Sequence, residues 1–220
     1  MKKCIIVANG TPPVKGIFNF LKMQGYDTLF CADGGANSAF KYNLIPDFII
    51  GDLDSIEEKV LSFYQNKCRI IQFKRQNDTD LEKCLKYASL KKYEEAVVLG
   101  ATGDRLDHSF CNLGIVLKFY DKIRVKIIHQ KSLLCAYSKN IELLSVKGET
   151  ISIYGFDQRT KIVSTGLKYS LKNIALPFGQ KESTSNIALG DKIKLQIRNG
   201  KIFVIRDFEL LVKHDLFQYT

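Results

Sequence analysis

Residues 46–56 read PDFIIGDLDSI, a short apolar run that passes directly into two carboxylates, Asp52 and Asp54. An apolar run of this length after a proline is typical of a buried strand. Residues two apart on an extended chain point to the same side, so the two carboxylates would repel each other unless a cation lies between them. The pattern favours Mg²⁺, which binds carboxylate oxygens together with phosphate oxygens of a substrate. The alternative is structural, with Asp54 or Ser55 capping a helix that starts at residue 56.

Similar apolar runs alternate with helical segments over residues 3–130. The expected strands are residues 3–8, 28–32, 48–50, 68–73, 96–99 and 125–128. The expected helices are residues 14–23, a short helix ending at residue 41, and residues 56–64, 79–90 and 106–120, the last with Leu106, Phe110, Leu113 and Leu117 on one stripe. This alternation predicts an α/β fold, a doubly wound and mostly parallel sheet with helices on both faces.

Polar motifs follow four of these strands. They are DGG at residues 33–35, Asp52 and Asp54, DTD at residues 78–80, and GATGDR at residues 100–105. Ligands bind beyond the carboxyl ends of the strands in such sheets. The sequence therefore predicts a binding site at this edge of the sheet.

Two of these motifs allow both a functional and a structural interpretation. The segment GATGDRLDH, residues 100–108, could bind phosphate at a helix N-terminus, and Arg105 could add bidentate hydrogen bonds to that phosphate. It is neither a GxxxxGK[ST] loop nor a three-glycine dinucleotide fingerprint, and Asp107 and His108 could instead be structural. In the DTD motif, Asp78 or Thr79 could cap a helix, which is compatible with metal binding by Asp80.

The pattern changes after about residue 132. Alternating apolar and polar residues predict strands at 150–154, 192–197 and 201–205, and Asn199-Gly200 predicts a hairpin between the last two. We therefore expect two domains, an α/β domain over residues 1–132 and an all-β sandwich over residues 133–220. On residue type alone, the run STSN at residues 183–186 is a polar loop.

Composition narrows the class of protein. The 220 residues are 45% hydrophobic and 25% charged, with a net charge of +10, but the lysines are scattered, as on a solvated surface. We therefore expect no nucleic-acid partner. No apolar run reaches the length of a membrane span and no signal peptide is evident, so we expect no membrane partner and a cytoplasmic protein. The six cysteines form no CxxC pair, which argues against zinc, and disulfides are not expected.

Six motifs in order resemble the thiamine pyrophosphokinase (thiamine diphosphokinase) family. They are CADGGAN (31–37), GDLDSI (51–56), NDTD (77–80), GATGDRLDH (100–108), STGLKYSL (164–171) and STSN (183–186). The resemblance implies an ATP- and Mg-binding catalytic domain followed by a β-sandwich domain for thiamine binding and dimerisation. It also implies a homodimer with active sites at the subunit interface. The implied reaction transfers a pyrophosphoryl group from Mg-ATP to the hydroxyethyl group of thiamine, giving thiamine diphosphate and AMP.

The resemblance also implies roles for individual residues. The Mg²⁺-binding, catalytic carboxylates are Asp52, Asp54 and Asp80. The nucleotide-binding residues are Asp33, Gln76, Thr79, Thr102, Gly103, Arg105, Asp107 and His108. The thiamine-binding residues are Tyr169, Ser183, Ser185 and Asn186. Tyr169 stands where many members have Trp, and Gln76 where many bacterial members have Lys. Asp80 or Asp54 could accept the proton of the thiamine hydroxyl. The alternatives are a nucleotide- or sugar-sensing binding module and another nucleotidyl or phosphoryl transferase.

Overall fold

The computed structural model describes residues 1–12, 14–74 and 77–220. The chain forms two compact units, Met1–Gln130 and Lys131–Thr220, whereas the sequence places the boundary after residue 132. Gln76, which is expected to bind nucleotide, lies outside the described residues. Within the described ranges, no helix has both the length and the apolar character needed to cross a membrane.

The first unit is built on a parallel sheet with the strand order β6-β5-β1-β2-β3-β4. Its strands are β1 (Lys3–Val7), β2 (Thr28–Ala32), β3 (Phe48–Gly51), β4 (Arg69–Gln72), β5 (Glu95–Leu99) and β6 (Arg124–His129). The chain moves outward from β1 to β4 and then returns to place β5 on the other side of β1. The direction of winding therefore reverses between β1 and β5, which is where such sheets bind ligands.

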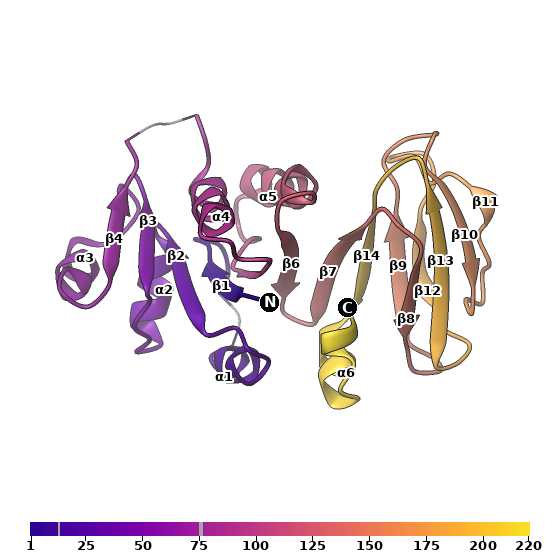
Figure 1. Ribbon diagram of the computed structural model, residues 1–220, viewed down its shortest axis with the longest axis horizontal. Coiled ribbons are helices and arrows are strands. Elements are labelled where there is room, and N and C mark those ends of the chain that lie inside the picture. The colour runs from indigo at the N-terminus through magenta and orange to yellow at the C-terminus, as the bar shows by residue number, and fades with distance from the viewer. Residues whose placement is uncertain (13, 75–76) are drawn as a thin grey trace. The chain divides into compact units, whose positions relative to one another are not determined.

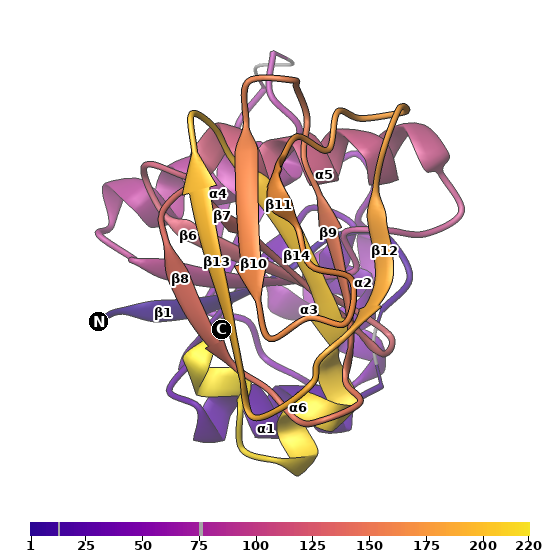
Figure 2. The same cartoon turned by 90° about the vertical axis from the view of Figure 1, so that its right-hand side faces the viewer.

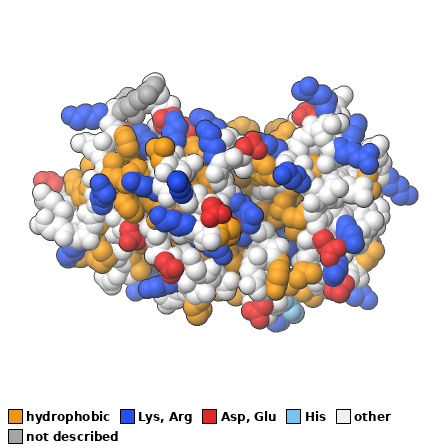
Figure 3. Space-filling view, viewed as in Figure 1, with side chains coloured by type: hydrophobic (Ala, Val, Ile, Leu, Met, Phe, Trp, Pro, Cys, Tyr) orange, Lys and Arg blue, Asp and Glu red, His pale blue; other side chains and the backbone are white. Residues whose placement is uncertain are grey.

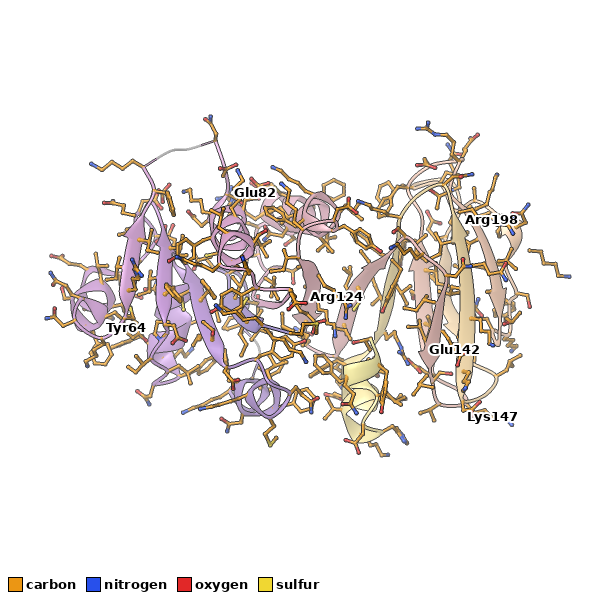
Figure 4. The ribbon with its side chains drawn as sticks, in the orientation of Figure 1. Tyr64, Glu82, Arg124, Glu142, Lys147 and Arg198 are labelled. Atoms are coloured by element: carbon orange, nitrogen blue, oxygen red, sulfur yellow. The ribbon has the colours of Figure 1, made fainter. Side chains whose placement is uncertain are left out.

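Helices cover this sheet on both faces. They are α1 (Gly16–Met23), α2 (Gly35–Lys41), α3 (Glu58–Tyr64), α4 (Asp80–Leu90) and α5 (Leu106–Phe119). Figure 1 shows α4 and α5 on one side and α2 on the other. Glu82 of α4, labelled in Figure 4, binds Lys118 of α5 at 2.6 Å and joins the two helices. The predicted doubly wound α/β fold is confirmed.

Burial on α5 differs from the predicted stripe. The buried residues of this helix are Asn112, Ile115, Val116 and Phe119. Leu106 and Phe110, which begin the expected stripe, are both exposed in the chain. The helix carries apolar residues on more than one face, so the spacing alone did not show which face packs against the sheet.

The second unit is a β-sandwich. One antiparallel sheet has the order β12-β9-β14-β7 and the other β11-β10-β13-β8, and Figure 2 shows the second sheet in front of the first. The strands are β7 (Ser132–Tyr137), β8 (Ile141–Leu144), β9 (Thr150–Tyr154), β10 (Lys161–Thr165), β11 (Lys172–Ile174), β12 (Ser183–Ile187), β13 (Lys192–Arg198) and β14 (Ile202–Asp207). Apolar side chains from both sheets, such as Ile153, Ile193 and Val204, form its core.

Two details of this unit differ from the prediction. The strands on either side of Asn199-Gly200 do not form a hairpin, because β13 pairs with β8 and β10 whereas β14 pairs with β7 and β9. The turn still needs its glycine, since a Cβ atom on Gly200 would lie 1.9 Å from Thr160 Oγ1. The chain also ends in helical turns, α6 (Phe208–Lys213) and η1 (Phe217–Tyr219), which the sequence analysis did not anticipate.

Charged side chains are mixed on the surface that Figure 3 shows. Lys and Arg side chains are interspersed with Asp and Glu over this face instead of gathering into one basic area. Such mixing is typical of a solvated surface.

Candidate active site

Two glycine-containing loops pair through their backbones at the carboxyl ends of β1 and β5. The N–H groups of Gly10 and Thr11 donate to the carbonyls of Gly100 and Thr102, each at 2.8 Å. A Cβ atom on Gly10 would lie 2.4 Å from the Gly100 carbonyl oxygen, so only glycine fits this approach. The two loops therefore form one continuous backbone surface.

This surface is part of a cavity of about 560 Å³. The volume lies within the range of small-molecule sites, which is about 300–1,000 Å³. The sequence-predicted residues that line it are Asp33, Thr79, Asp80, Thr102, Gly103, Arg105 and His108. The lining also includes Asn9, Thr11, Ser55, Asp104 and Asn112, to which the sequence analysis gave no role in ligand binding. Asn9 and Thr11 follow β1 at the same edge, so the strand-end rule could have found them.

Three carboxylates meet beside the cavity. Asp33 follows β2, Asp52 follows β3 and Asp80 begins α4, and one oxygen from each lies within 4.8 Å of the others. Asp33 adopts a positive φ of 41°, and its side chain packs over Gly51, where a Cβ atom would lie 2.7 Å from Asp33 Cβ. The glycine at the end of β3 therefore makes room for Asp33 in this carboxylate cluster, which comprises Asp33, Asp52 and Asp80.

Part of the cluster lacks partners. Asp33 is 1% exposed, and its Oδ2 accepts a hydrogen bond from the Ser55 N–H at 3.2 Å. Asp33 Oδ1 and Asp52 Oδ1 are buried and have no hydrogen-bond partner among the residues that the structure describes. Burial raises the pKa of Asp33 to about 6, against the opposing effect of the Ser55 N–H. Buried carboxylate oxygens without donors suit a hard cation, so these residues fit Mg²⁺.

Lys83 contacts the carboxylate cluster and was not found from the sequence. Its Nζ atom lies 2.7 Å from Asp80 Oδ1 and 3.3 Å from Asp52 Oδ2. Burial alone would raise the pKa of Asp52, but the hydrogen bond and charge of Lys83 outweigh it and hold this pKa below its ordinary value. A lysine one turn after Asp80 is the signal that could have revealed it.

Asp54 is not one of the three carboxylates whose oxygens lie within 4.8 Å of one another, but its side chain interacts with Asp33. It is exposed, and its Oδ1 accepts a hydrogen bond from Ser55 Oγ at 2.9 Å. The alternative that Asp54 or Ser55 caps a helix starting at residue 56 is wrong, because α3 begins at Glu58 with Glu57 as its N-cap. The loop is instead held by Asn37, whose side chain binds the Ser55 carbonyl and the Glu57 N–H, each at 3.0 Å. Metal binding by Asp54 stays a prediction.

The capping interpretation of the DTD motif is confirmed for Thr79. Thr79 is the N-cap of α4, and its hydroxyl accepts a hydrogen bond from the Glu82 N–H at 3.3 Å. Because Thr79 also lines the cavity, capping does not exclude a contact with a ligand.

The start of α5 forms another part of the cavity wall. The N-cap Arg105 makes no side-chain cap bond, and its guanidinium binds Asp107 at 2.5 Å. The hydrogen bond from Arg105 holds the pKa of Asp107 below its ordinary value. Asn112 fixes the preceding loop by donating to the Ala101 carbonyl at 2.7 Å, and Thr102 Oγ1 lies 2.7 Å from His129 Nδ1. Nucleotide binding by Arg105, Asp107 and His108 stays a prediction.

The predicted thiamine residues gather within the second unit. Asn186 Nδ2 donates to Ser183 Oγ at 3.1 Å and to the Tyr169 carbonyl at 2.8 Å. Ser185 lies where the pairing of β12 with β9 shifts register, and it adopts a positive φ of 51°. A non-glycine residue in this conformation is uncommon and is concentrated at binding sites. Tyr169 is 61% exposed, so it is not a core residue of this unit.

Comparisons with known proteins give a consistent result. Residues 21–128 match the model of "Thiamin pyrophosphokinase, catalytic domain", and residues 138–202 match "Thiamin pyrophosphokinase, vitamin B1 binding domain". Thiamine pyrophosphokinase 2 of Oryza sativa subsp. japonica is 31% identical, over 89% of this chain and 82% of its own length. Thiamin pyrophosphokinase 1 of Caenorhabditis elegans is 30% identical, over 79% and 76%.

Solved structures show the same fold. The thiamine pyrophosphokinase of Bacillus subtilis superposes with a TM-score of 0.81 at 22% identity, over 95% of this chain and 100% of that chain. The yeast thiamin pyrophosphokinase gives a TM-score of 0.80 at 19% identity, over 96% and 88%.

Proposed function

The chain belongs to the thiamin pyrophosphokinase family, and we propose from its own residues how it acts as a thiamine diphosphokinase. This activity transfers a pyrophosphoryl group from ATP to the hydroxyethyl group of thiamine, giving thiamine diphosphate and AMP. The observation that carries the assignment to this site is the cluster of Asp33, Asp52 and Asp80, whose buried unpartnered oxygens lie beside the cavity.

We assign Mg²⁺ to this carboxylate cluster, with Asp54 at its exposed side. Bound there, Mg²⁺ would neutralise charge on the polyphosphate of ATP. Two of the three carboxylates, Asp33 and Asp80, line the cavity, so a nucleotide in the cavity would lie beside them.

The rest of the cavity suits a nucleotide. The N-terminus of α5 borders it through Arg105, His108 and Ser109, and a helix N-terminus favours anionic groups. The glycine loops after β1 and β5 let the backbone approach a ligand closely. We therefore place the phosphates of ATP between the carboxylate cluster and the start of α5.

The chemistry requires positioning more than covalent help from the protein. The hydroxyl oxygen of thiamine forms a bond to the β-phosphorus of ATP while the bond from that phosphorus to the α-phosphate oxygen breaks, and AMP leaves. The hydroxyl proton passes to a carboxylate of the site, for which Asp80 and Asp54 are the candidates. Arg105 offers positive charge to the phosphates from the start of α5.

We propose that the exposed ring of Tyr169 stacks on thiamine and that Ser183 and Ser185 contact its pyrimidine. An aromatic face suits both the flat pyrimidine and the cationic thiazolium.

We also propose that the chain forms a homodimer with its active sites between subunits, which rests on the family resemblance. Sedimentation should give a dimer at assay concentration, and a fully active monomer would contradict this part of the proposal.

We propose a cytoplasmic location as well. Cys4, Cys31, Cys68, Cys84 and Cys111 are thiols, and Cys4, Cys31 and Cys84 are buried. Cysteines that remain thiols suit a reducing compartment.

The decisive experiment mixes the purified chain with Mg-ATP and thiamine and measures the nucleotide product. AMP formed in equal amount to thiamine diphosphate supports the proposal. ADP would indicate a different phosphoryl transferase, and no turnover despite nucleotide binding would indicate a binding module.

A further inference from the structure

A buried lysine lies inside the carboxylate cluster. Lys83 is 6% exposed, and its Nζ atom contacts one oxygen of Asp80 at 2.7 Å and one oxygen of Asp52 at 3.3 Å. A lysine is rarely buried to this extent unless its charge is paired. Both of its partners are carboxylates that we assign to the metal site, so the ammonium group lies within that site.

The helix places this charge by sequence spacing. Lys83 stands three residues after Asp80 on α4, so the two side chains lie on the same helix face. The next lysine of the helix, Lys86, binds Asp78 at 2.5 Å and is half-exposed, outside the cluster. Both lysines lie on α4 and pair with aspartates, but only Lys83 contacts the carboxylate cluster. Lys86 can therefore serve as the control for Lys83.

The charge balance decides what the cluster can bind. The three carboxylates of the cluster carry three negative charges when ionised, and the Lys83 ammonium reduces their net charge to minus two. Asp54 adds one more negative charge at the exposed side, where solvent screens it. A cation already present repels a second cation and occupies one oxygen each of Asp52 and Asp80. Asp33 Oδ1 and Asp52 Oδ1 have no partner among the described residues and could bind a divalent ion. The nearby ammonium group would weaken the attraction of their carboxylates for that ion. Phosphate oxygens of a nucleotide would supply further ligands and negative charge.

We propose that Lys83 is the resident counter-cation of the cluster, so that the free chain holds a divalent ion weakly until a nucleotide polyphosphate binds beside it. The proposal rests on the proposed function, because it requires a polyphosphate in the cavity that Asp33 and Asp80 line. Lys83 is not among the residues that line this cavity, so it is a positioning residue that acts through Asp52 and Asp80.

The first test uses the unchanged chain. Its binding of Mn²⁺ is measured by electron paramagnetic resonance without nucleotide, and its binding of a non-hydrolysable ATP analogue is measured by calorimetry with and without Mn²⁺. We expect a Kd for Mn²⁺ alone of about 1 mM or weaker, and analogue binding at least about tenfold tighter when Mn²⁺ is present. Binding of Mn²⁺ alone with a micromolar Kd would overturn the proposal.

The second test removes the charge. Lys83→Gln keeps a hydrogen-bond donor and is expected to bind Mn²⁺ alone at least about tenfold more tightly than the unchanged chain. Lys86→Gln removes a paired lysine from the same helix and should match the unchanged chain. Equal or weaker Mn²⁺ binding by folded Lys83→Gln would show that the lysine only scaffolds the carboxylates. If this variant does not fold, the titration of the unchanged chain still decides.

These measurements do not involve thiamine or turnover. A failure of the proposed function would appear as absence of AMP in the reaction with thiamine. A failure of the present inference would appear in the Mn²⁺ titrations, whether or not AMP is formed.

Discussion

The side-chain amide of Asn186 binds both backbone groups of Tyr169. Its Oδ1 accepts from the Tyr169 N–H at 3.0 Å, and its Nδ2 donates to the Tyr169 carbonyl at 2.8 Å. Asn186 is 1% exposed, whereas the ring of Tyr169 is largely exposed. The hydrogen bonds of this amide are thus made within the chain. They fix the backbone of Tyr169 while its ring stays exposed to solvent. A direct contact of Asn186 with thiamine stays a prediction.

Replacing Tyr169 tests the stacking role. Because the ring is exposed, Tyr169→Ala should leave Tm almost unchanged and raise the thiamine KM by about tenfold or less, as expected for loss of a stacking or cation–π contact. Tyr169→Trp should lower this KM or leave it unchanged, and the KM for ATP should not move in either variant. A lower Tm with unchanged thiamine affinity would show that the residue has a packing role.

Asn186→Ala should lower both stability and thiamine affinity. The substitution leaves the N–H and carbonyl groups of Tyr169 without their partner, which should cost about 1–3 kcal/mol of unfolding free energy. If Asn186 acts through Tyr169, adding Asn186→Ala to Tyr169→Ala should change the thiamine KM by less than about twofold. Additive effects on KM in this double-mutant cycle would instead support a direct contact of Asn186 with thiamine.

Gly51→Ala should disable the site without unfolding the chain. The added Cβ atom would lie 2.7 Å from Asp33 Cβ, so Asp33 must move within the carboxylate cluster. We expect turnover to fall by about 100-fold or more, because small displacements of catalytic groups are costly. Gly114→Ala is the control: nothing lies within 4 Å of its added Cβ atom in α5, so stability should rise slightly with activity unchanged. Normal turnover in Gly51→Ala would exclude a role for the position of Asp33.

Asp52→Asn and Asp54→Asn should each remove most turnover. Both residues are assigned to the metal site, and losing a ligand charge should cost several kcal/mol of transition-state stabilisation, or at least about 100-fold in kcat/KM. Their stabilities should differ, since Asp52 is paired with buried Lys83 whereas Asp54 is exposed. Melting curves and steady-state rates measure both effects. Turnover within about threefold of the unchanged chain in both variants would refute the metal assignment.

The pH dependence of stability should report the burial of Asp33. Its pKa is raised from 3.8 to about 6 in the folded chain, so folding favours the protonated form. This contribution to stability is fully present below the unfolded pKa and is lost as pH rises through the folded value. In EDTA, the Tm of Asp33→Asn relative to the unchanged chain should therefore increase between about pH 4 and pH 7. A difference that is constant across this range would show that Asp33 has an ordinary pKa.

Much of the fold was accessible from the sequence because its signals are local. Wholly apolar strands followed by helices define the parallel sheet, and the acids at strand ends mark the edge where Asp33, Asp52 and Asp80 meet. The hairpin predicted at Asn199-Gly200 was wrong because this dipeptide indicates a tight turn but not which sheet the next strand joins. That choice depends on packing across the sandwich, where Gly200 lies against Thr160.

The rest of the site depends on contacts between distant segments. The spacing from Asp80 makes Lys83 a candidate partner of that carboxylate, but its burial arises where Asp52 of another loop approaches α4. Likewise, the run of residues 183–186 does not show that Asn186 turns inward toward Tyr169. Burial and side-chain pairing of this kind depend on the assembled fold. A sequence pattern can therefore indicate candidate site residues but not the residues that they contact.

The backbone bonds from Gly10 to Gly100 and from Thr11 to Thr102 join two segments that the gene encodes far apart. An insertion or deletion in either loop would slide one segment along the other by about 3.3 Å and bring a non-glycine residue against a carbonyl group. A length change that shifts either paired stretch should therefore disrupt the site, so we expect the two loops to keep one fixed register.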